Sequence, residues 1–418
     1  MMTERAPEEL YEEREKRVRD AIQLKESDRV PVVLGGAYFA ARYTGIPASS
    51  IFYDLDAWKA AYKKTLLDFE PDLHSENTGR TGGLTLEALG AKQMRWPGYN
   101  LSSDTPYQFV EGEYMKEDEY KLFLSDPSDF MLRRYLPRAF EALEPLSKLP
   151  PLRSLFFSGA VAGTTPLFAT PDFLSLAGAL YQAGQAQQKW REEALGFEEE
   201  LAQIGFPAAF HFGGLGAPFD AVSDFLRGMR GSMLDMYRHP EEILEACDKI
   251  LEWQIANAIP ADPSRLGNPK RSFMALHRGS EGFMSIRQFE KFYWPGLKKA
   301  ILAHISLGYV PTVFMEGKFD SRLEYLLELP KKSIICRFVD TDMSRAKSVL
   351  GDHSCIMGNV PLALLQIGSA SEVDEYCRKL IKICGKGGGF ILTPGSSSIY
   401  GAKPENVRAM VDSVKKYR

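Results

Sequence analysis

Short apolar runs recur along the C-terminal half of the chain, and each ends in polar residues or glycine. They are residues 271–279, 309–317, 333–340, 354–360 and 388–395. A short run in which both alternating sets of residues are apolar is typical of a strand buried on both faces. Segments with helical spacing separate the runs: 285–307, 321–329, 344–350, 361–383 and 404–417. This alternation predicts right-handed βαβ units and a parallel sheet.

Three further strands are expected earlier in the chain, in RVPVVLGGAYF at 29–39 and near residues 72 and 207. The total of eight favours a closed (β/α)₈ barrel, a TIM barrel of the α/β class, over an open sheet. The amphipathic segment 7–25 is expected to be a helix that caps the barrel. A mostly helical pattern at about 118–206 predicts a helical insertion between early strands, within a single barrel domain spanning 1–418.

Functional sites of such barrels lie at the carboxyl ends of the strands. The polar residues that follow the expected strands are therefore the candidates for a pocket: Glu76, His211, His277, Arg278, Glu316, Lys318, Asp340, Asp342, Asn359 and Ser396 to Ser398. Asp72, His74 and Glu76 alternate, so they share one strand face, which is either a pocket wall or a solvated edge. Tyr38 is a candidate for stacking on an aromatic ligand, although most aromatic side chains serve as core.

Each of the central candidates has a structural alternative. Glu316 closes the apolar run Val313 to Met315, so it either faces a ligand or forms a buried ion pair with Lys318 or Arg337. His277 either lines the pocket or bonds to a backbone carbonyl. Asn359 orients a loop or a ligand, or caps a turn.

Composition narrows the function classes. The net charge of -4, the pI near 6.0 and the lack of a lysine or arginine run disfavour nucleic acid as a partner. The charged N-terminus lacks the apolar core of a signal peptide, and no apolar stretch reaches the roughly 18 residues of a membrane span. We therefore expect a soluble, cytoplasmic protein. The five cysteines include no close CxxC pair, which suits reduced thiols.

Several motifs together resemble the uroporphyrinogen decarboxylase superfamily. They are DRVPVV near the start, PFD, LRG and YRHPEE between Pro218 and Glu242, Asp340, MGNVP at 357–361, GGFIL at 388–392 and AKPENVRAM at 402–410. The resemblance covers nearly the whole chain and implies a (β/α)₈ barrel. It implies one of two activities: decarboxylation of the acetate arms of uroporphyrinogen, or methyl transfer to or from cobalamin on a corrinoid protein.

Departures from both patterns restrict the choice. Where the decarboxylases have a two-arginine motif that pairs with substrate carboxylates, LGGAYFAARY carries only Arg42. HSE at 74–76 places Glu76 where they have aspartate, and Ser396 stands at their C-terminal histidine. In the coenzyme M branch a His-x-Cys-Gly motif and a later cysteine bind zinc. Here Phe314 and Glu316 replace the first two ligands and Ser396 replaces the third, so that thiol-activating site is lost.

The resemblance that remains is to methyltransferases that pass a methyl group from a small donor, such as a methyl aryl ether, to the cob(I)alamin of a separate corrinoid protein. Glu316, His277 and Asp340 are the expected catalytic residues, because the ether oxygen needs a proton or a Lewis acid to leave. If a metal such as zinc is bound, these three are also its candidate ligands. The expected substrate-binding residues are Glu76, His74, Tyr38, His211, Arg278, Asn359 and Ser396.

Other assignments stay open at this point. No Asp-x-His-x-x-Gly occurs, so the corrinoid is expected on another chain. The alternative function is a decarboxylase or lyase acting on a carboxylated small molecule or tetrapyrrole, and a third is tetrapyrrole binding without chemistry. The sequence does not determine the methyl donor, the direction of transfer, or whether the chain forms a homodimer.

Overall fold

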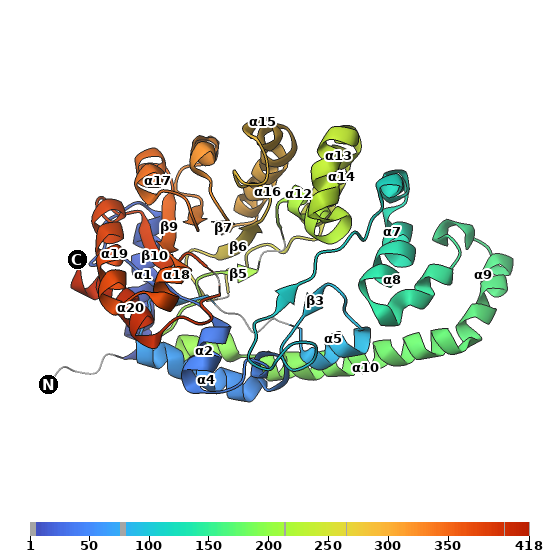
Figure 1. The fold of residues 1–418 in the computed structure, drawn as a ribbon, viewed down its shortest axis with the longest axis horizontal. Helices are drawn as coiled ribbons and strands as arrows, with labels where there is room; N and C mark the ends of the chain where they lie inside the picture. The colour runs from blue at the N-terminus through green and yellow to red at the C-terminus, as the bar shows by residue number, and fades with distance from the viewer. Residues whose placement is uncertain (1–5, 76–80, 213–214, 265, 397, 418) are drawn as a thin grey trace.

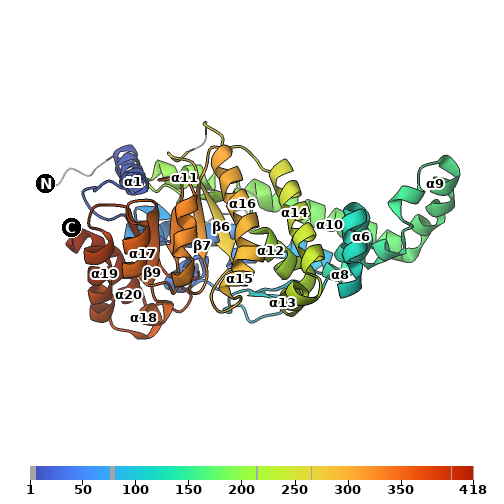
Figure 2. The same cartoon turned by 90° about the horizontal axis from the view of Figure 1, so that it is seen from above.

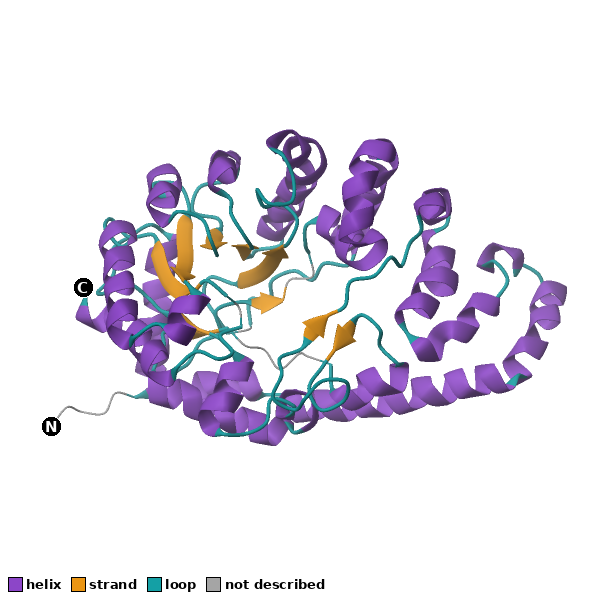
Figure 3. Cartoon of the chain, viewed as in Figure 1, coloured by secondary structure: helices purple, strands orange, loops and turns teal. Residues whose placement is uncertain are grey.

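Eight parallel strands form a closed barrel in the computed structural model, which describes residues 6–75, 81–212, 215–264, 266–396 and 398–417. The barrel strands are β1 (Val33–Leu34), β2 (Leu73–His74), β5 (His211–Phe212), β6 (Arg271–Leu276), β7 (Val310–Met315), β8 (Ile335–Phe338), β9 (Cys355–Val360) and β10 (Phe390–Pro394). All eight strands expected from the sequence are present, and they alternate with helices (Figure 3).

The ring closes through pairing at both ends of the main sheet. Six strands pair in the order β10-β9-β8-β7-β6-β5, and β1 pairs with β2. A parallel bridge between Val32 and Leu392 joins β1 to β10, and another between His74 and Ala208 joins β2 to the segment that leads into β5. Because every edge then has a neighbour, the sheet is a (β/α)₈ barrel, as the sequence predicted.

Helices surround the barrel (Figure 1). Those of the barrel units are α1 (Pro7–Ile22), α2 (Ala37–Thr44), α3 (Ser50–Tyr53), α4 (Leu55–Phe69), α12 (Pro218–Ala221), α13 (Gly228–Arg238), α14 (Pro240–Ala256), α15 (Ile286–Gln288), α16 (Trp294–Ser306), α17 (Met343–Leu350), α18 (Leu362–Ile367), α19 (Ala370–Cys384) and α20 (Pro404–Lys416). Three further helical segments belong to the same layer. They are the π-helical segments η6 (Val222–Arg227) and η7 (Phe289–Tyr293) and the 3₁₀ segment η8 (Asp320–Glu328).

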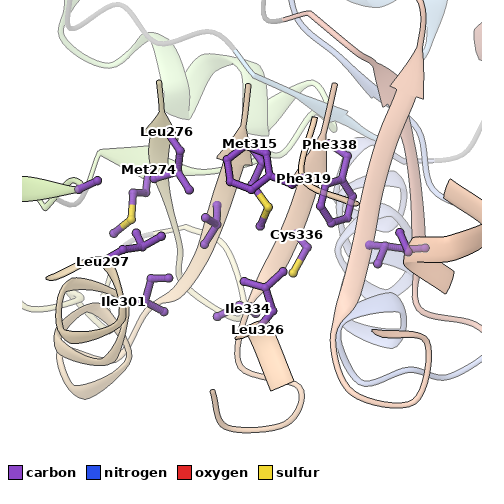
Figure 4. Close-up of a cluster of buried hydrophobic side chains, with 14 of the residues drawn as sticks. Met274, Leu276, Leu297, Ile301, Met315, Phe319, Leu326, Ile334, Cys336 and Phe338 are labelled. Atoms are coloured by element: carbon purple, nitrogen blue, oxygen red, sulfur yellow. The ribbon is translucent and has the colours of Figure 1, made fainter. Parts of the chain in front are cut away.

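The main core lies between the outer face of the sheet and these helices. Figure 4 shows alternate strand residues such as Met274, Met315 and Phe338 on this outer face, with Leu297 and Ile301 of α16 on the side of Met274. The other set of alternate residues points into the barrel, where Ile335, Met357 and Ile391 form a separate buried cluster. This alternation also determines which strand-end residues point toward the mouth of the barrel.

The chain between β2 and β5 is the largest departure from a plain barrel. Its elements are α5 (Gly83–Leu89), β3 (Met94–Arg95), β4 (Gln108–Phe109), η1 (Glu117–Glu119), α6 (Tyr120–Ser125), α7 (Pro127–Phe130), η2 (Met131–Tyr135), α8 (Leu136–Ala139), η3 (Glu141–Lys148), η4 (Leu152–Ser154), α9 (Ser158–Thr164), η5 (Thr165–Ala169), α10 (Pro171–Ala194) and α11 (Phe197–Gln203). The predicted helical insertion is thus present, and the antiparallel pair β3-β4 precedes it.

The 24-residue α10 runs along one side of the molecule and carries the outer part of the insertion far from the barrel (Figure 2). Among the described residues, no helix combines the length and apolar character needed to cross a bilayer.

Candidate active site

The ends of β6 and β7 bring two predicted catalytic residues to the mouth of the barrel. His277 follows β6 and Glu316 follows β7, and their backbones are adjacent because the Glu316 amide donates to the Leu276 carbonyl (3.2 Å). Both continue the inward-facing series of their strands, in which Phe273 and Phe314 are neighbours (ring centroids 5.7 Å apart). The strand pattern therefore directs both side chains toward the barrel axis.

Two aspartates from the turn after β5 hold the end of β6. Asp220 lies in α12 and accepts hydrogen bonds from the backbone amides of His277 (2.8 Å) and Arg278 (3.0 Å) and from the Tyr293 hydroxyl (2.7 Å). Asp224, one helical turn later, accepts from His277 Nδ1 (2.5 Å) and ion-pairs with Arg278 (2.8 Å). The imidazole is thus fixed through Nδ1, and Nε2 makes no hydrogen bond with any of the described residues.

The electrostatics of this cluster favour a charged imidazole. Burial opposes the charged form, but the Asp224 hydrogen bond and the charges of Asp220, Asp224 and Glu316 outweigh it and raise the pKa of His277 to about 9. Complete burial raises the pKa of Asp220 to about 6, although His277 acts in the opposite direction. The His277 side chain keeps 39% of its surface exposed, so its proton is within reach of a ligand.

Glu316 has a different environment. Burial raises its pKa above the usual value, Asp224 adds to the effect, and the charges of His277, Arg337 and Arg278 oppose it. Among the described residues, no side chain forms a hydrogen bond or ion pair with the Glu316 carboxyl group. The sequence alternative, a buried ion pair with Lys318 or Arg337, is therefore not formed: Lys318 pairs with Asp320 (3.8 Å).

Arg337 is a second cation at the mouth. It is 2% exposed on β8, lies over the Phe314 ring (4.4 Å), and donates to the carbonyls of Pro394 (3.4 Å) and Ser396 (3.3 Å). Arg278 forms an ion pair with Glu111 (2.9 Å), which follows β4. The segment that follows β4, before the helical insertion, thus contributes directly to the wall of the site.

Asp340 and Asn359 lie in a neighbouring cleft of about 450 Å³, whose lining includes Lys318 and Asp342. Asp340 is exposed, whereas the Asn359 amide donates to the carbonyls of Val339 (2.9 Å) and Thr341 (3.0 Å). Asn359 therefore orients the loop after β8, which is one of the two roles considered from the sequence.

Glu316, His277 and Asp340 do not fit a shared metal ion. Among the described residues, no three His, Cys, Asp or Glu side chains are arranged to hold one. His277 commits Nδ1 to Asp224, and Asp340 points into the neighbouring cleft. Glu316, His277 and Asp340 therefore do not form the zinc site that the sequence suggested.

The remaining candidates lie elsewhere. His74 is 1% exposed and packs edge-on against Tyr62 of α4 (5.8 Å), on the helix side of its strand. His211 pairs in register with Ser272 and lies 3.1 Å from Glu198. Ser272 precedes His277 by five positions, which places His211 roughly 16 Å below the mouth.

Tyr38 is 3% exposed, stacks with Tyr107 (6.4 Å) and accepts a hydrogen bond from the Tyr107 amide (3.0 Å). Ser396 Oγ donates to the Ser398 carbonyl (2.8 Å) at the end of β10. Glu76 and Ser397 fall outside the described residues. The structure therefore gathers Glu316, His277 and Arg278 at one place, with Ser396 linked to it through Arg337.

Sequence reasoning missed Asp220, Asp224 and Tyr293. Asp220 was noted only as part of the PFD motif, and no chemistry was assigned to it. The available signal was the spacing of the two aspartates, because residues four apart lie on one helix face. Their location directly after the third expected strand, near residue 207, would then have placed them at the mouth.

The fold and the sequence both resemble those of known proteins. A (β/α)₈ barrel with an acid–base cluster at the carboxyl ends of its strands defines an enzyme-type site. The sequence pattern of the uroporphyrinogen decarboxylase (URO-D) family matches residues 207–417. The chain belongs to this family, as its motifs indicated.

One similar solved structure is a methyltransferase from Methanosarcina mazei, with 15% sequence identity and a TM-score of 0.58. The alignment covers 97% of this chain and 98% of that protein, so the shared fold includes the segments outside 207–417. A search among curated protein sequences gave no significant match.

Replacing Asp224 with asparagine is expected to lower the pKa of His277 by about 1 to 3 units, because an opposite charge and a charged hydrogen bond are both removed. Because the pKa of His277 is lower in the variant, its imidazolium form is lost at a lower pH than in the wild type. Titration of the His277 ring by NMR measures this directly. Asp248→Asn, an exposed residue of α14, is the control, and an unchanged His277 titration in Asp224→Asn would refute the assignment.

Proposed function

We propose that the protein is a methyltransferase that moves a methyl group from a small donor, a methyl aryl ether, to the cob(I)alamin of a separate corrinoid protein. Family membership and the fold shared with a methyltransferase support methyl transfer as the reaction class. The observation that carries the proposal is the pair of titratable groups at the mouth: His277, with a pKa of about 9, and Glu316, whose pKa is raised by burial.

The chemistry requires a proton at the leaving oxygen. The corrinoid of the partner supplies the nucleophile that takes the methyl group. Breaking the methyl–oxygen bond leaves the electron pair on the aryl oxygen, and a phenoxide, with a pKa of about 10 for its phenol, leaves more easily when protonated. His277 and Glu316 deliver that proton, which yields the phenol, and one proton from water restores the pair.

The arrangement suits this role. At pH 7 a group with a pKa of about 9 carries its proton, and Asp224 fixes Nδ1 of His277 while Nε2 makes no hydrogen bond with any of the described residues. Glu316 directly follows β7, whose inward-facing Phe314 ring is buried in contact with Phe273 and Arg337. Arg278 and Arg337 provide charge that an anionic substituent of the donor would pair with.

The test combines the purified protein with a corrinoid protein reduced to cob(I)alamin and guaiacol under anaerobic conditions. We expect methylcob(III)alamin absorbance and an equal amount of catechol. Catechol in place of guaiacol is the control without a methyl group. If guaiacol and related aryl ethers give no methylcobalamin while methanol or a methylamine does, the donor class is wrong. If no donor is active, methyl transfer to a corrinoid is refuted.

A further inference from the structure

An arm with few charged residues projects from the barrel. The arm, defined here as residues 152–188, contains η4, α9, η5 and the first three quarters of α10. Figures 1 and 2 both show α9 and the adjoining part of α10 standing away from the rest of the molecule. Nothing in the candidate active site depends on this segment.

The composition of the arm differs sharply from that of the chain. Charged residues make up 25% of the protein, yet between Ser154 and Gln188 the only one is Asp172. Its carboxylate is paired with Lys148 at the base of the arm. An exposed helical segment normally keeps charged residues on its solvent face, so their absence indicates that the arm is covered by something.

Large apolar side chains of the arm are exposed. They are Leu152 (41%), Phe156 (84%), Phe157 (55%), Val161 (47%), Phe168 (51%), Leu174 (64%), Leu180 (45%) and Tyr181 (67%). Their exposed surface is on the order of 800 Å², the amount that each partner contributes to a standard protein interface.

Helix α10 has two distinct faces. Phe173, Leu176, Ala183 and Trp190 are buried against their own chain. Leu174, Gly178 and Tyr181 lie on the opposite face, where their spacing of four and three residues forms one stripe. This second stripe has no partner among the described residues.

Two glycines inside α10 have no explanation in the single chain. A Cβ added at Gly178 or Gly184 would meet nothing within 4 Å, so alanine fits at both. Glycine inside a helix costs about 1 kcal/mol relative to alanine. Gly178 lies on the stripe of Leu174 and Tyr181, so close approach of a second helix backbone accounts for glycine at this position.

We infer that the occupant is a second copy of this chain, bound so that α10 of one copy packs against α10 of the other. A two-fold interface places a patch against itself, so charges near the axis would face like charges. The arm avoids that repulsion because it carries no charge there. A membrane surface fits less well, since helices that bind one carry lysine or arginine on their polar face. A charged protein partner would find no charge to complement.

Sedimentation of the full-length protein over a concentration series tests the inference. We expect a wild-type dimer, and Leu174→Lys or Tyr181→Lys should weaken dimerisation by about 30-fold or more. Ile367→Lys is the matched control, because Ile367 is also exposed (81%) but lies at the end of α18, on the other side of the molecule. Circular dichroism shows whether each variant is folded.

A second variant places the axis. All five native cysteines are buried, so Gly178→Cys adds one reactive surface thiol. We expect it to form an interchain disulfide in the dimer, with little in Glu192→Cys at the other end of the helix. A monomeric wild type at high concentration, or a dimer unaffected by both lysine variants, overturns the inference. A monomer that binds lipid vesicles through the arm would also overturn the inference, because the occupant would then be a membrane.

Discussion

Glu316→Gln is expected to lower the rate of methyl transfer by about 10² to 10⁴-fold, the usual effect of removing a general acid. Glutamine keeps the size of the side chain but cannot deliver a proton. Because burial raises the pKa of Glu316, its protonated form persists to higher pH than in an ordinary glutamate and is lost as the pH rises through that value. The variant should therefore also lose the corresponding limb of the pH–rate profile.

Glu316→Gln removes an acid without removing a structural contact. Glu316 has no hydrogen-bonding or ion-pairing side chain among the described residues, so glutamine should leave the unfolding midpoint nearly unchanged. Donor affinity, measured by calorimetry, should change little. Glu324→Gln is the control from the segment after the same strand, where the glutamate pairs with Arg345 at the surface (2.7 Å). Wild-type activity in Glu316→Gln would refute its role and leave His277 as the acid.

Glu15→Gln is expected to destabilise the protein by about 3 to 5 kcal/mol, the range for removing one partner of a buried ion pair. Glu15 of α1 and Arg271 of β6 are 2% and 1% exposed. Their two hydrogen bonds measure 2.8 and 2.7 Å. Arg271 also donates to the carbonyls of Ala208 and Ala209, so a neutral partner leaves its charge buried at the closed end of the barrel.

Urea denaturation of the variant and the wild type measures this difference. Lys63→Met, which removes a surface pair with Glu200 (3.0 Å), is the control and should cost at most about 1 kcal/mol. The double variant Glu15→Met with Arg271→Leu should recover most of the loss, because no charge is then left unpaired. Equal midpoints for Glu15→Gln and the wild type would show that the pair does not anchor α1.

The barrel was predictable because its signal is local. Runs such as Val310–Met315 are apolar on both faces, and helical segments separate them, so strand number and type followed from spacing alone. The shortest strands were the hardest to bound: β1 and β2 contain two residues each, and they close the ring through single bridges. Such pairing depends on neighbours far away in the sequence.

The site was predictable only in part. Glu316 and His277 were identified because each ends a buried strand, and the position of a strand end is a local property. Their partners were not, because Asp220 and Asp224 come from a helix more than fifty residues earlier than His277. His74 and His211 also follow the strand pattern, but the side of the strand and the height along the barrel differ.

The sequence by itself determined the alternation of strands and helices, the eight-strand count, the family and the carboxylate at the end of β7, the fifth barrel strand. Each of these depends on residues close together in the chain. The tertiary structure alone decided which polar groups meet at the mouth, why the pKa of His277 is raised, and that the arm stands exposed. Charge interactions and burial depend on distances between segments, and only the closed barrel sets those distances.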